Sequence, residues 1–243
     1  MAHHTTWPTG NPGDDRSSAR NMLRVARSFG VGLVCVLGCS LALAQDMAGA
    51  KDHPAIKRFA GSSIVAYDVK QFDTVDIPTS TFVKFNLSAG KREFALPPAV
   101  AEGRRTRIWY EAPGETSSVA VFRNYATELT AEGFTLLYDS TKDTKLGRWN
   151  GYLNSFSFIK APLATNRSQF VLTGAALSGI NTLSAKRERE GLVTYVHLVT
   201  VQWDKPNVTF KAQRGAYVAL DVVDVGSLKQ DMVSVSASDM SKA

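Results

Sequence analysis

Apolar and polar residues alternate along much of the chain, which is the pattern of β-strands that bury one face. Residues 62–78, 106–112 and 134–140 each alternate in this way, and a proline ends the first stretch. Residues 216–225 are a further strand candidate, and residues 192–204 are the longest. In the longest candidate, a period of two places one set of side chains on a common face, namely Val193, Tyr195, His197, Val199, Val201 and Trp203.

One stretch, residues 119–133, follows a helical period instead. Serines that precede it are good N-cap residues, and Gly133 is placed to end the helix in a left-handed conformation. Together with the strands on either side, this helix predicts a strand–helix–strand unit. Its buried face is predicted to comprise Val119, Phe122, Tyr125 or Ala126, and Leu129.

The remaining stretches carry weaker patterns. Residues 81–96 predict a hairpin that turns at an Ala-Gly pair. Residues 97–105 and the charged residues 178–191 are interpreted as connections, and residues 140–158 as a loop or a hairpin. Residues 45–59 begin polar and predict a loose lead-in.

Strands outnumber helices, and the later strands are joined by short loops. This pattern favours an α+β fold, a mostly antiparallel sheet with one main helix packed on a face. Residues 45–243 are long enough for one large domain or two small ones, and the absence of a linker favours a single α+β domain with a short polar tail.

The first 44 residues are interpreted as an N-terminal extension and signal peptide. Arg20, Arg24 and Arg27 precede a run without charge that extends to Ala44, and small residues stand before the bond from Ala44 to Gln45. The run is shorter than the roughly 20 apolar residues of a spanning helix, which disfavours a membrane anchor. Translation from the second methionine, Met22, would give a more typical leader than translation from Met1.

Both cysteines of the chain, Cys35 and Cys39, lie in this leader. The letters VLGC resemble a lipobox, in which Cys39 would be lipidated and would become the first residue. Leu37 is unusual in that motif, and the segment that follows Cys39 is apolar where a lipoprotein tether is polar. We therefore favour cleavage after Ala44, which would leave a mature domain without cysteine.

The chain has a formal charge of +6. The leader holds four of the 28 basic and two of the 22 acidic residues, so the remainder carries +4. Its charges are mixed along the sequence rather than massed, which argues against a nucleic-acid partner.

Catalytic and cofactor motifs are not found. No G-x-S-x-G sequence is present, and the one G-x-G lies in the leader. The two histidines of the mature chain, His53 and His197, are far apart, so neither a metal site nor a cofactor is expected. His197 could act as a general base, but a buried sheet histidine is the simpler interpretation. Asp221 and Asp224 would face opposite sides of a strand and could not form an acid–base pair.

A stretch rich in aromatic residues offers the one candidate ligand surface. Arg148, Trp149 and Tyr152 could stack on sugar rings, with His197 as a further contact, whereas the alternative is a hairpin that buries its aromatics. The sequence leaves both interpretations open.

Two terminal stretches together resemble a bacterial envelope family, a domain of unknown function named DUF4892. The opening reads DHPAIKRFAGSSIVAYDVKQFD and the closing reads YVALDVVDVGSLKQDMV. Between them, TRIWYEAPGETSSVAVFRNYATELTAEGFTLLYD is similar to the family's strand, helix and Gly-Phe strand. The resemblance spans about Asp52 to Val233.

In that family the module often precedes an OmpA-like domain that binds peptidoglycan. This chain stops at Ala243, where that domain would begin, so peptidoglycan binding does not carry over. Gly226, Ser227 and Leu228 also depart from the family's closing motif, and the family implies no catalytic residues.

These observations predict an exported protein, periplasmic or associated with the outer membrane. We expect a non-enzymatic binding or accessory module of the cell envelope, with an envelope protein or glycan as partner. The alternatives are a hydrolase or transferase that uses His197 with carboxylates, and an accessory protein that binds lipid. The sequence leaves the oligomeric state open.

Overall fold

The structure is a computed structural model that describes residues 45–112, 114–143, 149–154, 171, 178–205, 208–209 and 212–226. The chain divides into two units, residues 1–41 and 42–243, and every described residue belongs to the second. The elements are β1 (Ser63–Ile77), β2 (Phe82–Asn86), β3 (Lys91–Phe94), β4 (Ala99–Glu111), α1 (Ser118–Ala131), β5 (Thr135–Asp139), the 3₁₀ turn η1 (Ser140–Lys142), α2 (Trp149–Asn154), β6 (Ser178–Arg189), β7 (Leu192–Trp203) and β8 (Gly215–Val225).

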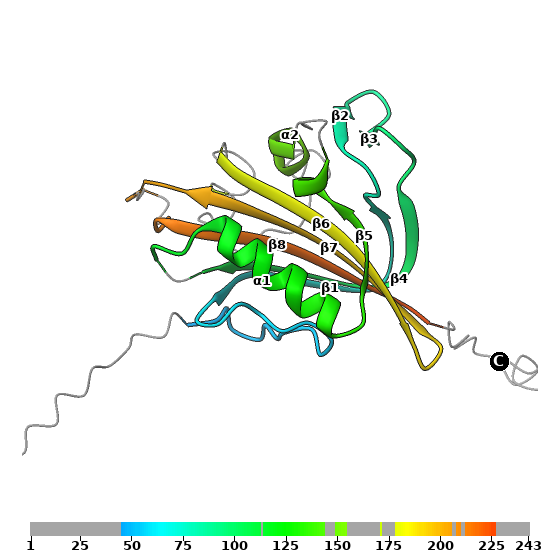
Figure 1. The fold of residues 1–243 in the computed structure, drawn as a ribbon, viewed down its shortest axis with the longest axis horizontal. Helices are drawn as coiled ribbons and strands as arrows, with labels where there is room; N and C mark the ends of the chain where they lie inside the picture. Colours follow the sequence, from blue (N-terminus) through cyan, green and yellow to red (C-terminus); the bar gives the residue numbers. More distant parts are fainter. Residues whose placement is uncertain are drawn as a thin grey trace, which may run out of the picture. The chain divides into compact units, whose positions relative to one another are not determined.

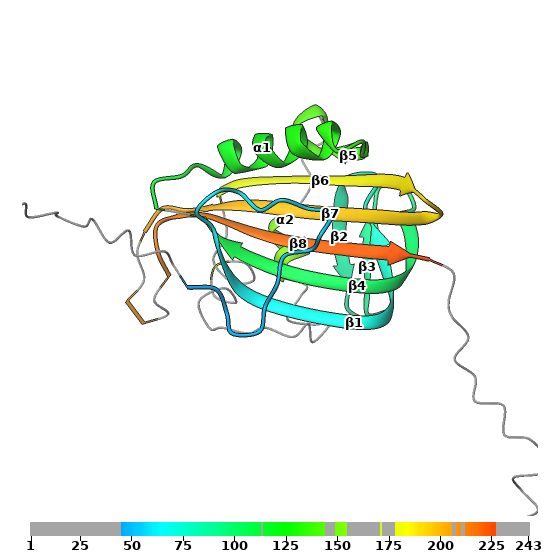
Figure 2. The same ribbon diagram turned by 90° about the horizontal axis from the view of Figure 1, so that it is seen from below.

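Six of the strands form one antiparallel sheet in the order β1-β4-β8-β7-β6-β5, and β2 and β3 form a separate hairpin. Helix α1 lies along one face of the six-stranded sheet, above β6 and its neighbours (Figures 1 and 2). The predicted architecture of a mostly antiparallel sheet with one main helix on a face is therefore confirmed.

The helix-side face of the sheet holds the larger apolar cluster. Its side chains alternate with those of the opposite face, since Ile108 and Tyr110 pack under α1 while Trp109 packs on the other side. Helix α1 contributes Val121, Phe122, Tyr125 and Leu129, whereas Val119 is exposed, so the predicted helical face was wrong by half a turn at its start.

Both predicted helix ends are confirmed. The Ser117 side chain accepts a hydrogen bond of 3.1 Å from the backbone N–H of Ala120. Gly133 has a φ of +82° and follows the last turn, a conformation that glycine adopts without steric cost.

Residues 45–62, the N-terminal strap, also cover the helix-side face. The Arg58 guanidinium donates two hydrogen bonds of 2.7 Å to the carboxylate of Asp46 and one of 2.8 Å to Asp52. Asp46 also accepts a hydrogen bond of 2.8 Å from the backbone N–H of Ile64 in β1. The prediction of a loose lead-in was therefore wrong, because charged residues of the strap pair with each other and with the sheet.

Two predicted connections are strands. Residues 97–105 contain the start of β4, and residues 178–191 contain β6. The β6–β7 hairpin turns through Glu190 and Gly191, both with positive φ, and Arg189 pairs directly with Leu192. Gly103 of β4 allows a close approach to β8, since a Cβ there would lie 2.1 Å from the carbonyl oxygen of Asp224.

The opposite face of the sheet is covered by the β2–β3 hairpin and by α2. Phe82 of β2 and Tyr152 and Leu153 of α2 are buried against Trp109 and Val199 of the sheet. Helix α2 corrects the prediction of a loop or hairpin for this stretch, whereas the hairpin at residues 81–96 is confirmed.

Candidate functional site

One row of directly opposed residues crosses all six strands on the face that α2 and the hairpin cover. Each member pairs in register with the next member on the neighbouring strand, and the members have charged or polar side chains. From β1 to β5 this cross-strand row comprises Asp68, Arg107, Asp221, His197, Ser184 and Tyr138.

A bidentate ion pair lies at the centre of the cross-strand row. The Nε and Nη2 atoms of Arg107 donate to the two carboxylate oxygens of Asp221, each at 2.7 Å. Both residues are buried. Burial alone would raise the pKa of Asp221, but the Arg107 guanidinium outweighs it and holds that pKa below its ordinary value. Asp221 is therefore an ionised partner of arginine rather than a proton carrier.

A second buried arginine completes the charge balance beside the row. Arg105 donates to Asp68 and, at 2.7 Å, to Asp73. Two arginines and three aspartates thus neutralise most of each other's charge within the covered face. Buried charges require such pairing, because an isolated ion loses its hydration when it leaves water.

His197 contacts two oxygen atoms through the same ring nitrogen. Its Nδ1 atom lies 3.0 Å from the Ser184 hydroxyl oxygen and 3.1 Å from the carbonyl oxygen of Leu183. Since a carbonyl oxygen only accepts, this second contact assigns a proton to Nδ1. Burial lowers the pKa of His197 to about 4, so the imidazole is neutral at physiological pH.

Aromatic side chains close over His197. The ring of Tyr152 meets the imidazole edge to face, with centroids 5.2 Å apart. Phe82 packs on Tyr152 at 5.7 Å, and the guanidinium carbon of Arg92 lies 4.0 Å from the centre of the Tyr152 ring. A layer from β2, β3 and α2 therefore seals the centre of the row.

Two of the four predicted ligand-contact residues, Tyr152 and His197, thus touch each other. Both are buried, so they form part of a core and not an open sugar platform. Arg148 and the side chain of Trp149 lie outside the described residues.

The row contains serine, histidine and aspartate, but their atoms are not arranged as in a hydrolase. A serine hydrolase needs one imidazole nitrogen as acceptor for the serine proton and the other as donor to the carboxylate. Here the protonated Nδ1 faces Ser184, and both oxygens of Asp221 bind Arg107. Ser184 is 0%, His197 3% and Asp221 5% exposed, so a substrate does not reach them.

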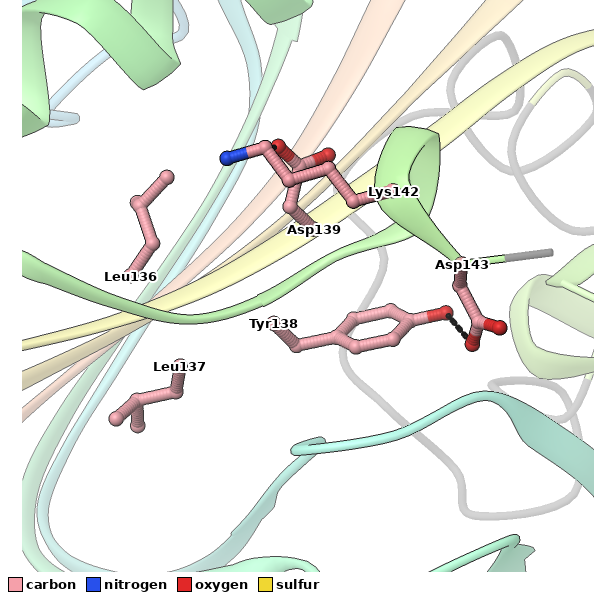
Figure 3. Close-up of a pocket in the computed structure, with 6 residues that line it drawn as sticks. All are labelled: Leu136, Leu137, Tyr138, Asp139, Lys142 and Asp143. Atoms are coloured by element: carbon pink, nitrogen blue, oxygen red, sulfur yellow. Dashed lines mark hydrogen bonds and ion pairs between the residues drawn. The ribbon is translucent and has the colours of Figure 1, made fainter. Parts of the chain in front are cut away.

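An open pocket of about 370 Å³ lies at the edge of the sheet, beside the Tyr138 end of the row. Figure 3 shows Leu136 and Leu137 on one side and, on the other, Lys142 of η1 with Asp139 and Asp143 at its two ends. The Tyr138 hydroxyl donates a hydrogen bond of 3.1 Å to Asp143, and the Lys142 ammonium forms an ion pair of 3.6 Å with Asp139. The pocket is therefore lined by apolar groups together with paired charged groups.

His53 lies on the helix-side face of the sheet, opposite to the face that holds His197. His53 of the N-terminal strap lies 2.9 Å from Asp224, which also accepts 2.9 Å from the Thr194 hydroxyl. Asp221 faces the covered row and Asp224 faces the strap, so the prediction that they occupy opposite faces of the strand is confirmed.

Within the described residues, no group of three His, Cys, Asp or Glu side chains could hold a metal ion. Among the same residues, no helix has the length and apolar character needed to cross a membrane. The predicted cleavage and lipidation residues Ala44 and Cys39 lie outside the described part, and Gln45 is exposed at its start.

Several residues of this site were missed at the sequence level, among them Arg92, Arg107 and Ser184. The period-two alternation of residues 105–109 could have placed Arg107 on the same face as Trp109. Nothing local identifies Asp221 as its partner, because the two lie on strands that are distant in sequence.

No protein-family model matches the chain, and no curated protein matches it at a significant level.

Proposed function

We propose that the chain is an exported protein of the bacterial cell envelope that binds an envelope protein or glycan and does not catalyse a reaction. The observation that carries the proposal is the closure of the cross-strand row. Its serine, histidine and aspartate are buried, and their polar atoms are engaged in contacts that oppose catalysis. The side chains best suited to chemistry therefore stabilise the sheet.

The proposed export is supported by the leader pattern and by where the structural contacts begin. Asp46, two residues beyond the predicted cleavage bond, holds Arg58 and the first residues of β1. Cleavage after Ala44 would therefore leave the anchoring contacts of the N-terminal strap intact. The resemblance to the DUF4892 envelope family supports the same location.

The open pocket at the edge of the sheet supports binding as the activity. It offers the exposed Lys142 beside two leucines, whereas the row behind it is sealed. A ligand in this pocket would contact Lys142 and Asp139 without entering the core.

A serine hydrolase is the second candidate, because the fold does bring Ser184 and His197 within 3.0 Å and places Asp221 on the next strand. A fluorophosphonate probe separates the two candidates, since it reacts with serines that a general base activates. We expect no adduct on Ser184 when the labelled protein is digested and its peptides are weighed. An adduct on Ser184 that disappears in His197→Gln would contradict the proposed binding role, and Ser184→Ala controls for labelling elsewhere.

A further inference from the structure

The β2–β3 hairpin has two unlike sides. Its inner side contributes Phe82, Phe85 and Phe94 to the layer that seals the cross-strand row. Its tip and flanks instead expose large apolar side chains. Leu87, in the turn, is 69% exposed, and Val83 and Leu96 are exposed as well.

The turn that carries Leu87 is ordered by its own hydrogen bonds. The Asn86 side chain accepts a hydrogen bond of 3.1 Å from the backbone N–H of Ala89 and donates one of 2.8 Å to Glu93. Gly90 has a φ of +62°, which lets the chain return tightly into β3. Leu87 is therefore held at the surface by the fold, although an exposed leucine costs free energy in water.

Basic side chains flank this apolar tip. Lys84 and Lys91 are exposed on the two strands of the hairpin, and Arg92 follows Lys91. One acidic residue, Glu93, lies opposite Lys84 at 3.3 Å. The guanidinium of Arg92 turns inward onto the Tyr152 ring, so the exposed side of the hairpin carries two lysines against one acidic group. Lysines can keep their charge in the headgroup region while their stems cover apolar surface.

We propose that the β2–β3 hairpin docks the protein on the surface of an anionic lipid bilayer. Leu87 enters the boundary between headgroups and acyl chains, and Lys84 and Lys91 contact anionic headgroups. The charge of the hairpin complements such a surface, and a protruding tip fits a deformable bilayer without a shaped pocket. The inference deepens the proposed function, on which it rests for the location of the protein beside a membrane.

The test uses the purified mature chain, residues 45–243, and vesicles of phosphatidylglycerol and phosphatidylcholine. We expect flotation with the anionic vesicles, and roughly tenfold weaker binding by Leu87→Asp. Val208→Asp is the matched control, because Val208 is another apolar side chain on a turn and is 92% exposed. That variant should bind as the unchanged chain does.

A second readout locates the contact at the hairpin tip. Tryptophan at Leu87→Trp should be quenched by brominated phosphatidylglycerol, whereas tryptophan at Val208→Trp should not. Equal flotation of both Asp variants, or no additional quenching in Leu87→Trp, would overturn the inference. Recovery of the protein from the cytoplasm would instead count against the proposed function, so the two failures are distinguishable.

Discussion

Arg107 and Asp221 are separated by 114 positions in the sequence, yet their side chains form a bidentate ion pair on the covered face. Loss of one partner would leave the other as an uncompensated buried charge, which costs about 3–5 kcal/mol in comparable pairs. His197 lies beside this pair in the row and is buried without charge. Burial therefore keeps His197 neutral, whereas the Arg107 guanidinium keeps Asp221 ionised against the effect of burial.

Protonation of His197 predicts a specific dependence of stability on pH. The pKa of His197 is about 4 in the fold and 6.5 ordinarily, so the unfolded chain binds more protons between these values. Stability from the neutral imidazole is complete above pH 6.5 and is lost as the pH falls towards 4. From this residue alone, the free energy of unfolding should be about 2 kcal/mol lower at pH 5 than at pH 7.

Urea unfolding at the two pH values measures this difference. His197→Gln should remove the 2 kcal/mol step, whereas His53→Gln, at the other buried histidine, should retain it. Asp221 does not interfere, because its lowered pKa affects stability below this range. The same step in His197→Gln as in the unchanged chain would show that His197 is not held neutral by burial.

The N-terminal strap combines apolar packing on the sheet with a few polar contacts that centre on Arg58. Arg58 joins Asp46, Asp52 and the carbonyl oxygen of Ser62, and its side chain is 25% exposed. Lys57, its neighbour in sequence, pairs with Glu128 and Glu132 but is 70% exposed, so water weakens those pairs.

Arg58→Met should therefore loosen the strap, while Lys57→Met should not. We expect roughly tenfold faster hydrogen exchange at two backbone N–H groups. The N–H of Met47 donates to the carbonyl oxygen of Ile64 in β1, and the N–H of Ile64 donates to Asp46 of the strap. Exchange in β7 and β8 serves as the internal control and should not change. Unaltered protection of Met47 in Arg58→Met would contradict the ionic anchoring of the strap.

Elements with clear periodicity could be predicted from the sequence. Strands β1, β7 and β8, the β2–β3 hairpin and helix α1 all follow alternation or helical spacing. Strand β6 was missed because its charged end resembles a loop, although Lys186 and Arg187 pair with residues of β7. The start of β4 was not predicted, because two prolines and a glycine in that stretch are typical of a connection.

The candidate site was less predictable than the fold. His197 and Tyr152 were identified, but their burial depends on α2, which local propensity did not indicate. The partners of Arg105 and Arg107 come from strands that meet only once the sheet has formed. Sequence patterns report which face a residue takes, not which distant charge neutralises it.

At the scale of the whole molecule, one antiparallel sheet is covered on both faces without a disulfide among the described residues. The strap and α1 cover one face, and the β2–β3 hairpin and α2 cover the other (Figures 1 and 2). Two exposed features of this scaffold, the edge pocket and the hairpin tip, are the places where we propose contacts with the envelope.

The intact mass of the protein recovered from fractionated cells decides whether the chain is exported to the envelope. We predict that osmotic shock releases a chain that begins at Gln45, with the 44-residue leader removed. A chain that begins at a diacylated Cys39 would retain the envelope location but contradict soluble release. A full-length chain that stays in the cytoplasmic fraction would contradict export to the envelope.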